Sequence, residues 1–162
     1  VMCNLGLSHA LRDAGIDLVQ TKVGDRYVLE AMREGGFVVG GEQSGHMIFL
    51  EHNSTGDGLV TALQFLAACK RAGKSIEEAA SVMTRFPQTL VNVQVHDKHA
   101  ADGNAAVQAA VAAAEEALGD SGRVLLRPSG TEPVVRVMVE AASAEEAERH
   151  ALAIADVVKA EL

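Results

Sequence analysis

Residues 124–139 read VLLRPSGTEPVVRVMV, in which two apolar segments flank a loop bounded by Pro128 and Pro133. Short apolar runs separated by a turn sequence are typical of strands. Gly130 lies in the middle of the loop, where a sharp change of chain direction needs a residue without a side chain. The segment therefore predicts two neighbouring strands joined by a tight connection.

The segments around this hairpin complete a regular pattern. A mostly alternating apolar run over 90–95 predicts a further strand, and helical periodicity predicts one helix over 102–118 and another that begins at Ser143. The resulting order is β-α-β-β-α. This order predicts an α+β sandwich with helices on one face of an antiparallel sheet.

The first half of the chain has a different character, with helices and short strands in alternation, which indicates an α/β layer architecture. Pro87 follows the last of these elements, and the composition changes there, so we expect two domains, residues 1–86 and 87–162. Ser75 and Glu78 form a capping box for a short helix. The other elements expected are a helix over 5–14, a helix capped by Asp25 and ended by Gly35-Gly36, a helix over 59–72, and strands over 16–19, 37–39 and 47–50.

Composition limits the classes of function. The 162 residues carry a formal net charge of -8, which disfavours non-specific attraction to nucleic acid or to an anionic membrane. No run approaches the roughly 18 apolar residues of a membrane span, and two cysteines are too few for a disulfide scaffold. We therefore expect a cytoplasmic protein. Because the chain begins with Val1 rather than Met, we also expect it to be part of a longer protein.

The loop of residues 127–133 has the chemistry of a phosphate site. Gly130 allows the backbone to approach an anion closely, and the Ser129 and Thr131 hydroxyls add donors. Arg127 and Arg136 supply planar guanidinium groups that match phosphate oxygens, and Arg123 is close in sequence. The alternative is an ordinary hairpin turn, in which Pro, Ser, Gly and Thr are also common.

A second polar loop, residues 41–46, suits a sugar. Glu42, Ser44 and His46 place a carboxylate, a hydroxyl and an imidazole on a turn flanked by glycines, and such groups satisfy the hydroxyls of a desolvated polyol. The alternatives are a polar hairpin turn and a histidine with a purely structural role.

A third loop, residues 21–26, connects a predicted strand to a helix N-terminus, where α/β proteins often bind ligands. It carries Lys22 and Arg26. The alternative interpretation is that Asp25 acts only as an ordinary helix cap.

Three motifs, TKVGDRYV (21–28), GGEQSGH (40–46) and RPSGTEPVVR (127–136), occur in this order, and together they resemble the α-D-phosphohexomutase superfamily. The resemblance spans essentially the whole chain. It implies a partial Rossmann-like α/β domain, the end of the third of four domains, followed by a TATA-binding-protein-like antiparallel sheet with two helices, the fourth.

The resemblance also implies an isomerase that interconverts glucosamine 6-phosphate and glucosamine 1-phosphate through a phosphoserine and a bisphosphorylated sugar, on the route to UDP-N-acetylglucosamine and peptidoglycan. By the same resemblance, two groups of residues contact the phosphosugar. The sugar is read by Glu42, Ser44 and His46; phosphate is held by Arg127, Ser129, Gly130, Thr131 and Arg136, while Lys22 and Arg26 are further candidates.

The family's phosphoserine loop and its Mg²⁺ loop belong to the first two domains, and nothing in this sequence resembles either. We therefore expect no metal ligands and no catalytic residue here, N-terminal domains of the same protein as partners, and an inactive isolated chain. Two alternatives remain open: phosphomannomutase or phosphoglucomutase activity, and a non-catalytic phosphosugar-binding module. The sequence upstream of the chain would discriminate between them.

Overall fold

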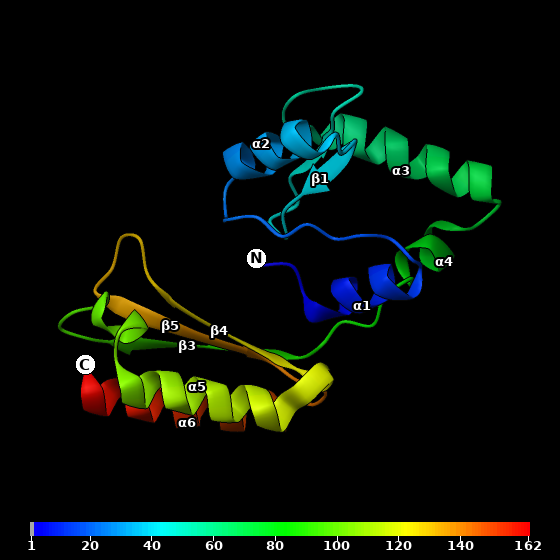
Figure 1. The fold of residues 1–162 in the computed structure, drawn as a ribbon. Helices are drawn as coiled ribbons and strands as arrows, with labels where there is room; N and C mark the ends of the chain where they lie inside the picture. The colour runs from blue at the N-terminus through cyan, green and yellow to red at the C-terminus, as the bar shows by residue number, and fades with distance from the viewer. Residues whose placement is uncertain (1) are drawn as a thin grey trace. The chain divides into compact units, whose positions relative to one another are not determined.

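The computed structural model describes residues 2–162 (Figure 1). The chain divides into two compact units, the first ending at Arg85 and the second covering Phe86–Leu162. Each unit has its own secondary structure and its own hydrophobic core. Among the described residues, no helix combines the length and the apolar character needed to cross a membrane.

The first unit is built from four helices and a two-stranded antiparallel ribbon. Strands β1 and β2 pair in the register Val39↔Phe49 and Gly41↔Met47. Helix α2 packs against the ribbon, where Val28 and Met32 form a small core with Ile48. The elements are α1 (Leu5–Asp13), α2 (Asp25–Gly35), β1 (Val39–Gly41), β2 (Met47–Phe49), α3 (Gly58–Ala72) and α4 (Ile76–Ala80).

Polar side chains define several of the helix starts. The Asp57 carboxylate accepts from the first amides of α3, and the Ser75 side chain accepts from the Glu78 N–H at the start of α4. The Ser75 N–H donates to the Glu78 carboxylate in return, and these bonds lower the pKa of Glu78. The capping box predicted from the sequence is therefore present.

Two local predictions for the first unit are wrong. Residues 16–19 were expected to form a strand, but they form none, because no partner strand lies beside them among residues 2–162 to satisfy their backbone groups. Asp25 was expected to cap α2; the cap is Gly24, whose φ of 130° suits only glycine, and Asp25 is the first helical residue.

The second unit is an antiparallel three-stranded sheet in the order β3-β5-β4. Figure 1 shows α5 and α6 together on one face of this sheet. The predicted order of strands and helices is present, although α5 begins three residues later than expected because Asn104 caps it. The elements are β3 (Gln88–Gln94), η1 (Ala100–Asp102), α5 (Ala105–Leu118), η2 (Gly119–Ser121), β4 (Arg123–Pro128), β5 (Val134–Glu140) and α6 (Ala144–Glu161).

The central strand β5 determines which side chains face the helices. Val135, Val137 and Val139 are fully buried in one core with Ile154 and Val158 of α6. Because side chains alternate along a strand, the residues between these valines point to the opposite face of the sheet. Arg136 is one of them, so the packing of β5 against the helices sets the orientation of its guanidinium.

We expect Val137→Ala to lower the free energy of unfolding by about 2 kcal/mol, because it leaves a cavity in the centre of the sheet–helix core. Leu152→Ala on the exposed side of α6 is the control, with an expected change within about 0.5 kcal/mol. Urea unfolding of both variants measures the difference, and equal losses would contradict the placement of β5.

Candidate functional site

The connection between β4 and β5 is a short loop with a buried base and an exposed tip. The Ser129 N–H donates to the Val134 carbonyl at 2.9 Å and closes the loop, and Ser129 itself is only 2% exposed. Gly130, Thr131 and Glu132 are exposed. The loop therefore has a fixed base and presents its tip to solvent.

Two arginines lie directly opposite each other at the base of this loop. The β4–β5 register pairs Arg127 with Arg136 across the two strands, so both side chains lie on the same face of the sheet. Like charges in this position repel each other. An anion that binds between them lowers this repulsive electrostatic energy. The pairing is the strongest sign of an anion site in the structure.

The two guanidiniums differ in their partners. Arg136 Nη2 donates to Glu132 Oε2 at 3.0 Å and to Ser129 Oγ at 3.3 Å, while its Nε is buried without a hydrogen-bond partner. The Arg127 guanidinium has no hydrogen bond or ion pair to any other residue in 2–162. The Arg127 guanidinium therefore has donors left for an external ligand, whereas the Arg136 Nε is enclosed by protein.

Further donors are available at the tip of the loop. Within the described part of the chain, the amides of Gly130 and Thr131 and the Thr131 hydroxyl make no hydrogen bond. Phosphate oxygens accept bonds from such backbone amides and hydroxyls as well as from guanidinium groups. The structure thus brings all five predicted phosphate-binding residues to one end of the β4–β5 hairpin.

Arg123 does not belong to this group, although the sequence places it near Arg127 and Arg136. Its Nε donates to Glu140 Oε2 at 2.7 Å, and the Glu140 side chain is fully buried. The register pairs Arg123 with Glu140 at the far end of the two strands. This arginine neutralises an internal carboxylate.

The second polar loop forms the turn between β1 and β2. The Glu42 N–H donates to the His46 carbonyl at 2.9 Å, and the Gly45 N–H donates to the Glu42 carbonyl at 3.0 Å, with Gly45 at a φ of 97°. Ser44 and His46 are exposed, and Glu42 is half-buried. The three predicted sugar-binding residues therefore share one tight turn.

The N-terminus of α2 holds two of these side chains. The Gly24 N–H donates to Glu42 Oε1 at 2.7 Å, and Asp25 Oδ1 lies 3.6 Å from His46 Nδ1. Neither contact is predicted from the sequence, where Asp25 is interpreted as a helix cap. Proximity of TKVGDRYV to GGEQSGH in the fold was the missing information.

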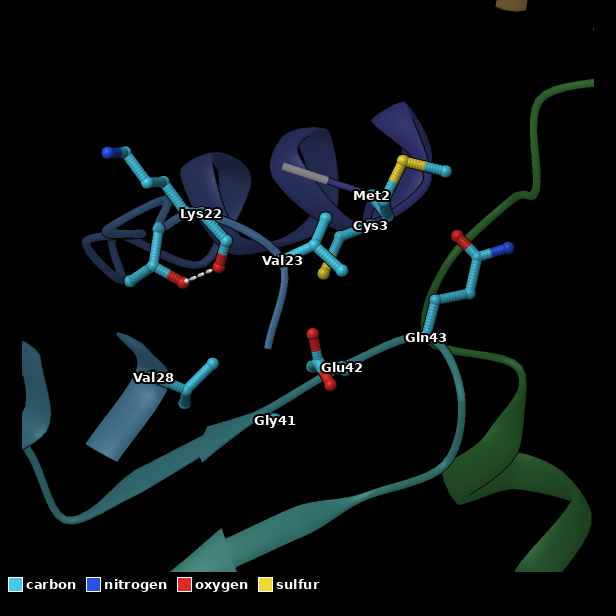
Figure 2. A pocket seen from close by; sticks show the side chains of 9 residues that line it. Met2, Cys3, Lys22, Val23, Val28, Gly41, Glu42 and Gln43 are labelled. Atoms are coloured by element: carbon cyan, nitrogen blue, oxygen red, sulfur yellow. Dashed lines mark hydrogen bonds between the residues drawn. The ribbon is translucent and has the colours of Figure 1, made fainter. Parts of the chain in front are cut away.

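Lys22 and Arg26 have different positions. Lys22 lines a small pocket with Val23, Glu42 and other residues, and Figure 2 shows the Glu42 carboxylate directed into this pocket while the Lys22 ammonium extends away from it. Lys22 Nζ lies 5.9 Å from the centre of the Tyr27 ring. Arg26 forms an ion pair with Glu30 at 2.8 Å on the surface of α2, which raises its pKa.

Asp25, Glu42 and His46 also form a group with the ligand types of a cation site, since one ligand atom from each lies within 4.8 Å of the others. Mg²⁺ prefers an all-oxygen octahedral shell, and an imidazole nitrogen fits that preference poorly. Glu42 Oε1 is already engaged by the Gly24 amide. The group is a poor match for Mg²⁺.

Family models match both units. Residues 1–86 match the phosphoglucomutase/phosphomannomutase alpha/beta/alpha domain III, and residues 90–157 match the C-terminal domain of the same family. The chain belongs to this family. The predicted resemblance to phosphohexomutases is confirmed.

Curated relatives and solved structures agree with this assignment. The chain is 60% identical over 162 residues to phosphoglucosamine mutase of Thermobifida fusca and 54% identical to that of Bacillus licheniformis, and it spans 36% of the length of each. Aspergillus fumigatus N-acetylphosphoglucosamine mutase has a similar fold, with a TM-score of 0.83 at 24% identity, over 99% of this chain and 37% of that one. The predicted fold class is confirmed.

We expect Arg127→Ala to weaken binding of inorganic phosphate by at least about tenfold while the free energy of unfolding changes little, because Arg127 has no partner in the described residues. Arg149→Ala, which removes an exposed arginine of α6, is the charge-matched control. Phosphate titration followed by NMR measures both; equal affinities would remove Arg127 from the site.

Proposed function

We propose that this chain is the C-terminal part of a mutase that interconverts glucosamine 6-phosphate and glucosamine 1-phosphate. Residues 1–86 would be the end of the sugar-binding domain and residues 87–162 the phosphate-binding domain. The observation that carries the proposal is the Arg127/Arg136 pair beside unpartnered loop amides, a site for a dianion. The phosphoglucosamine mutase relatives, 54–60% identical along nearly the whole chain, support the choice of sugar.

A reaction through a bisphosphorylated sugar needs an anchor for the phosphate that is not reacting. The Arg127 and Arg136 guanidiniums, the Ser129 and Thr131 hydroxyls and the Gly130 amide provide it, because none of these donors requires a particular sugar orientation. When that phosphate is fixed, the rest of the substrate is held in place. The energy of phosphate binding then serves to orient the reacting group toward the phosphoserine. The attacking phosphoserine would lie in the first two domains.

The turn between β1 and β2 would read the sugar. The Glu42 carboxylate can accept from two adjacent hydroxyls, and Ser44 and His46 complete a set that serves either orientation of the ring. Lys22 is close enough in the fold to share the pocket of Glu42. Arg26 is a weaker candidate, because Glu30 already holds its guanidinium.

Magnesium would act from outside this chain. A magnesium complex of the Aspergillus fumigatus enzyme is among the solved structures with this fold, at a TM-score of 0.77. The Asp25, Glu42 and His46 group has the wrong donor set for Mg²⁺, so we place the magnesium ligands in the preceding domains, and we expect the isolated chain to bind phosphosugar without converting it.

Exposed apolar side chains support the presence of further domains of the same protein. Leu59, Leu63 and Leu66 of α3 are each about half exposed or more. Ile16 and Val19 are similarly exposed. Apolar surface exposed to water is unfavourable in free energy, and further domains packed on these side chains would bury that surface.

The proposed enzyme is a cytoplasmic one that provides a precursor for UDP-N-acetylglucosamine and peptidoglycan, with no nucleic-acid or membrane partner. The net charge of -8 supports the exclusion of nucleic acid. Phosphomannomutase or phosphoglucomutase activity is the second candidate, favoured by the family description itself, which names both. A non-catalytic phosphosugar-binding module is the third.

A chimera tests the proposal directly. Residues 1–162 replace the matching segment of Thermobifida fusca phosphoglucosamine mutase, and the product is assayed with glucosamine 6-phosphate, glucose 6-phosphate and mannose 6-phosphate. We expect conversion of glucosamine 6-phosphate with the highest kcat/KM. We expect Glu42→Ala in the chimera to lower kcat/KM by roughly 100-fold, because a buried sugar hydroxyl loses its acceptor.

Glu51→Ala is the control for the Glu42 variant, because Glu51 is an exposed carboxylate just after the same ribbon. A folded chimera that is inactive on all three substrates would favour the non-catalytic module, and a preference for mannose or glucose phosphate would favour the second candidate. Equal effects of the two substitutions would remove Glu42 from the site.

A further inference from the structure

Lys98 reaches the phosphate loop from a distant part of the sequence. It follows β3 and is half-buried, and its ammonium donates to the Ser129 carbonyl at 2.7 Å. The same nitrogen lies 3.3 Å from the Glu132 carbonyl and 3.4 Å from the Gly130 carbonyl. An ammonium has three N–H donors, so one side chain serves three backbone acceptors of a single loop.

These contacts determine where the loop amides point. The described peptide bonds are all trans, so the C=O of each residue and the N–H of the next point in opposite directions across one plane. Holding the Ser129 carbonyl therefore directs the Gly130 N–H away from Lys98, and holding the Gly130 carbonyl does the same for the Thr131 N–H. These are the two amides that have no partner in residues 2–162.

The three bonds also fix a segment that would otherwise be free to move. Glycine has more backbone freedom than any other residue type. Gly130 is also not confined by its surroundings, because a Cβ placed on it would meet no atom within 4 Å. A mobile loop must lose that freedom when it binds a ligand, and the loss weakens affinity. An ammonium that binds three carbonyls orders the loop in advance.

We propose that Lys98 is a positioning residue for anion binding. It donates hydrogen bonds to the Ser129 and Gly130 carbonyls, and this orients the Gly130 and Thr131 N–H groups of the same peptide planes toward the ligand. The ligand is the phosphate group of the substrate, so the inference rests on the proposed function only in taking this loop as a phosphate site. Lys98 needs no direct contact with the ligand.

The test uses the 162-residue chain labelled with ¹⁵N and inorganic phosphate as the probe. In the unmodified chain, the Gly130 and Thr131 amides should shift on titration and report the affinity. Lys98→Met removes the ammonium at similar length, and we expect phosphate affinity to fall roughly tenfold, the effect of losing well-directed amide donors and one nearby charge.

Two companion variants separate positioning from net charge and from stability. Lys159→Met removes an exposed lysine of the same unit and should leave the affinity within about twofold, as expected for a solvent-screened charge that makes no hydrogen bond to the loop. Lys98→Arg keeps the charge and the donors and should recover part of the affinity. In Lys98→Met, the backbone order parameters of Gly130 and Thr131 should fall to below about 0.6, the range of flexible backbone, while the core strands stay unchanged.

Equal phosphate affinity in Lys98→Met and Lys159→Met would overturn the proposal, as would unchanged order parameters at the two amides. Absence of any phosphate-dependent shift at these amides in the unmodified chain would overturn it as well. Failure of the proposed function has a different signature: the chimera would be inactive on hexosamine phosphates while the isolated chain still bound phosphate in a Lys98-dependent way.

Discussion

The proposed anion site depends on one constraint, the antiparallel register that sets Arg127 directly opposite Arg136. Two guanidiniums on neighbouring strands and the same face repel each other, and the sheet cannot relieve this by slipping, because a shift of one residue would turn the buried valines of β5 toward the wrong face. The core therefore holds the two charges together. An oxyanion between them turns the repulsion into two favourable interactions.

At the opposite end of β4 and β5, an arginine is neutralised by a carboxylate of the protein itself. Arg123 lies four residues from Arg127 on the same face of β4, and it is opposite Glu140, a buried carboxylate that it neutralises. Burying such a carboxylate alone would be strongly unfavourable. Positive charge available to a ligand is thus confined to the loop end of the hairpin, although all three arginines lie close together in the sequence.

Local sequence was sufficient where the cause of a structure is local. The strands over 124–126 and 134–139 follow from apolar runs around a glycine-containing loop, and the Ser75–Glu78 capping box from two residues three positions apart. Predictions from the sequence were wrong or missing where a structural feature depends on residues far away in the chain. Residues 16–19 have strand-like side chains without a partner strand in the described residues, and the contact of Lys98 with Ser129 spans 31 positions without any local signal.

The two functional loops are built on the same principle, each within its own unit. The Gly24 amide and Asp25 contact side chains of the β1–β2 turn, and Lys98 contacts the β4–β5 loop, in each case through groups that no motif of the loop itself predicts. Each loop leaves exposed polar groups, Ser44 and His46 in one and Gly130 and Thr131 in the other. A loop that is fixed through one side can present the other side to a ligand and loses less conformational entropy when it binds. The proposed recognition of a charged sugar by two short polar loops therefore depends on residues elsewhere in the fold that order them.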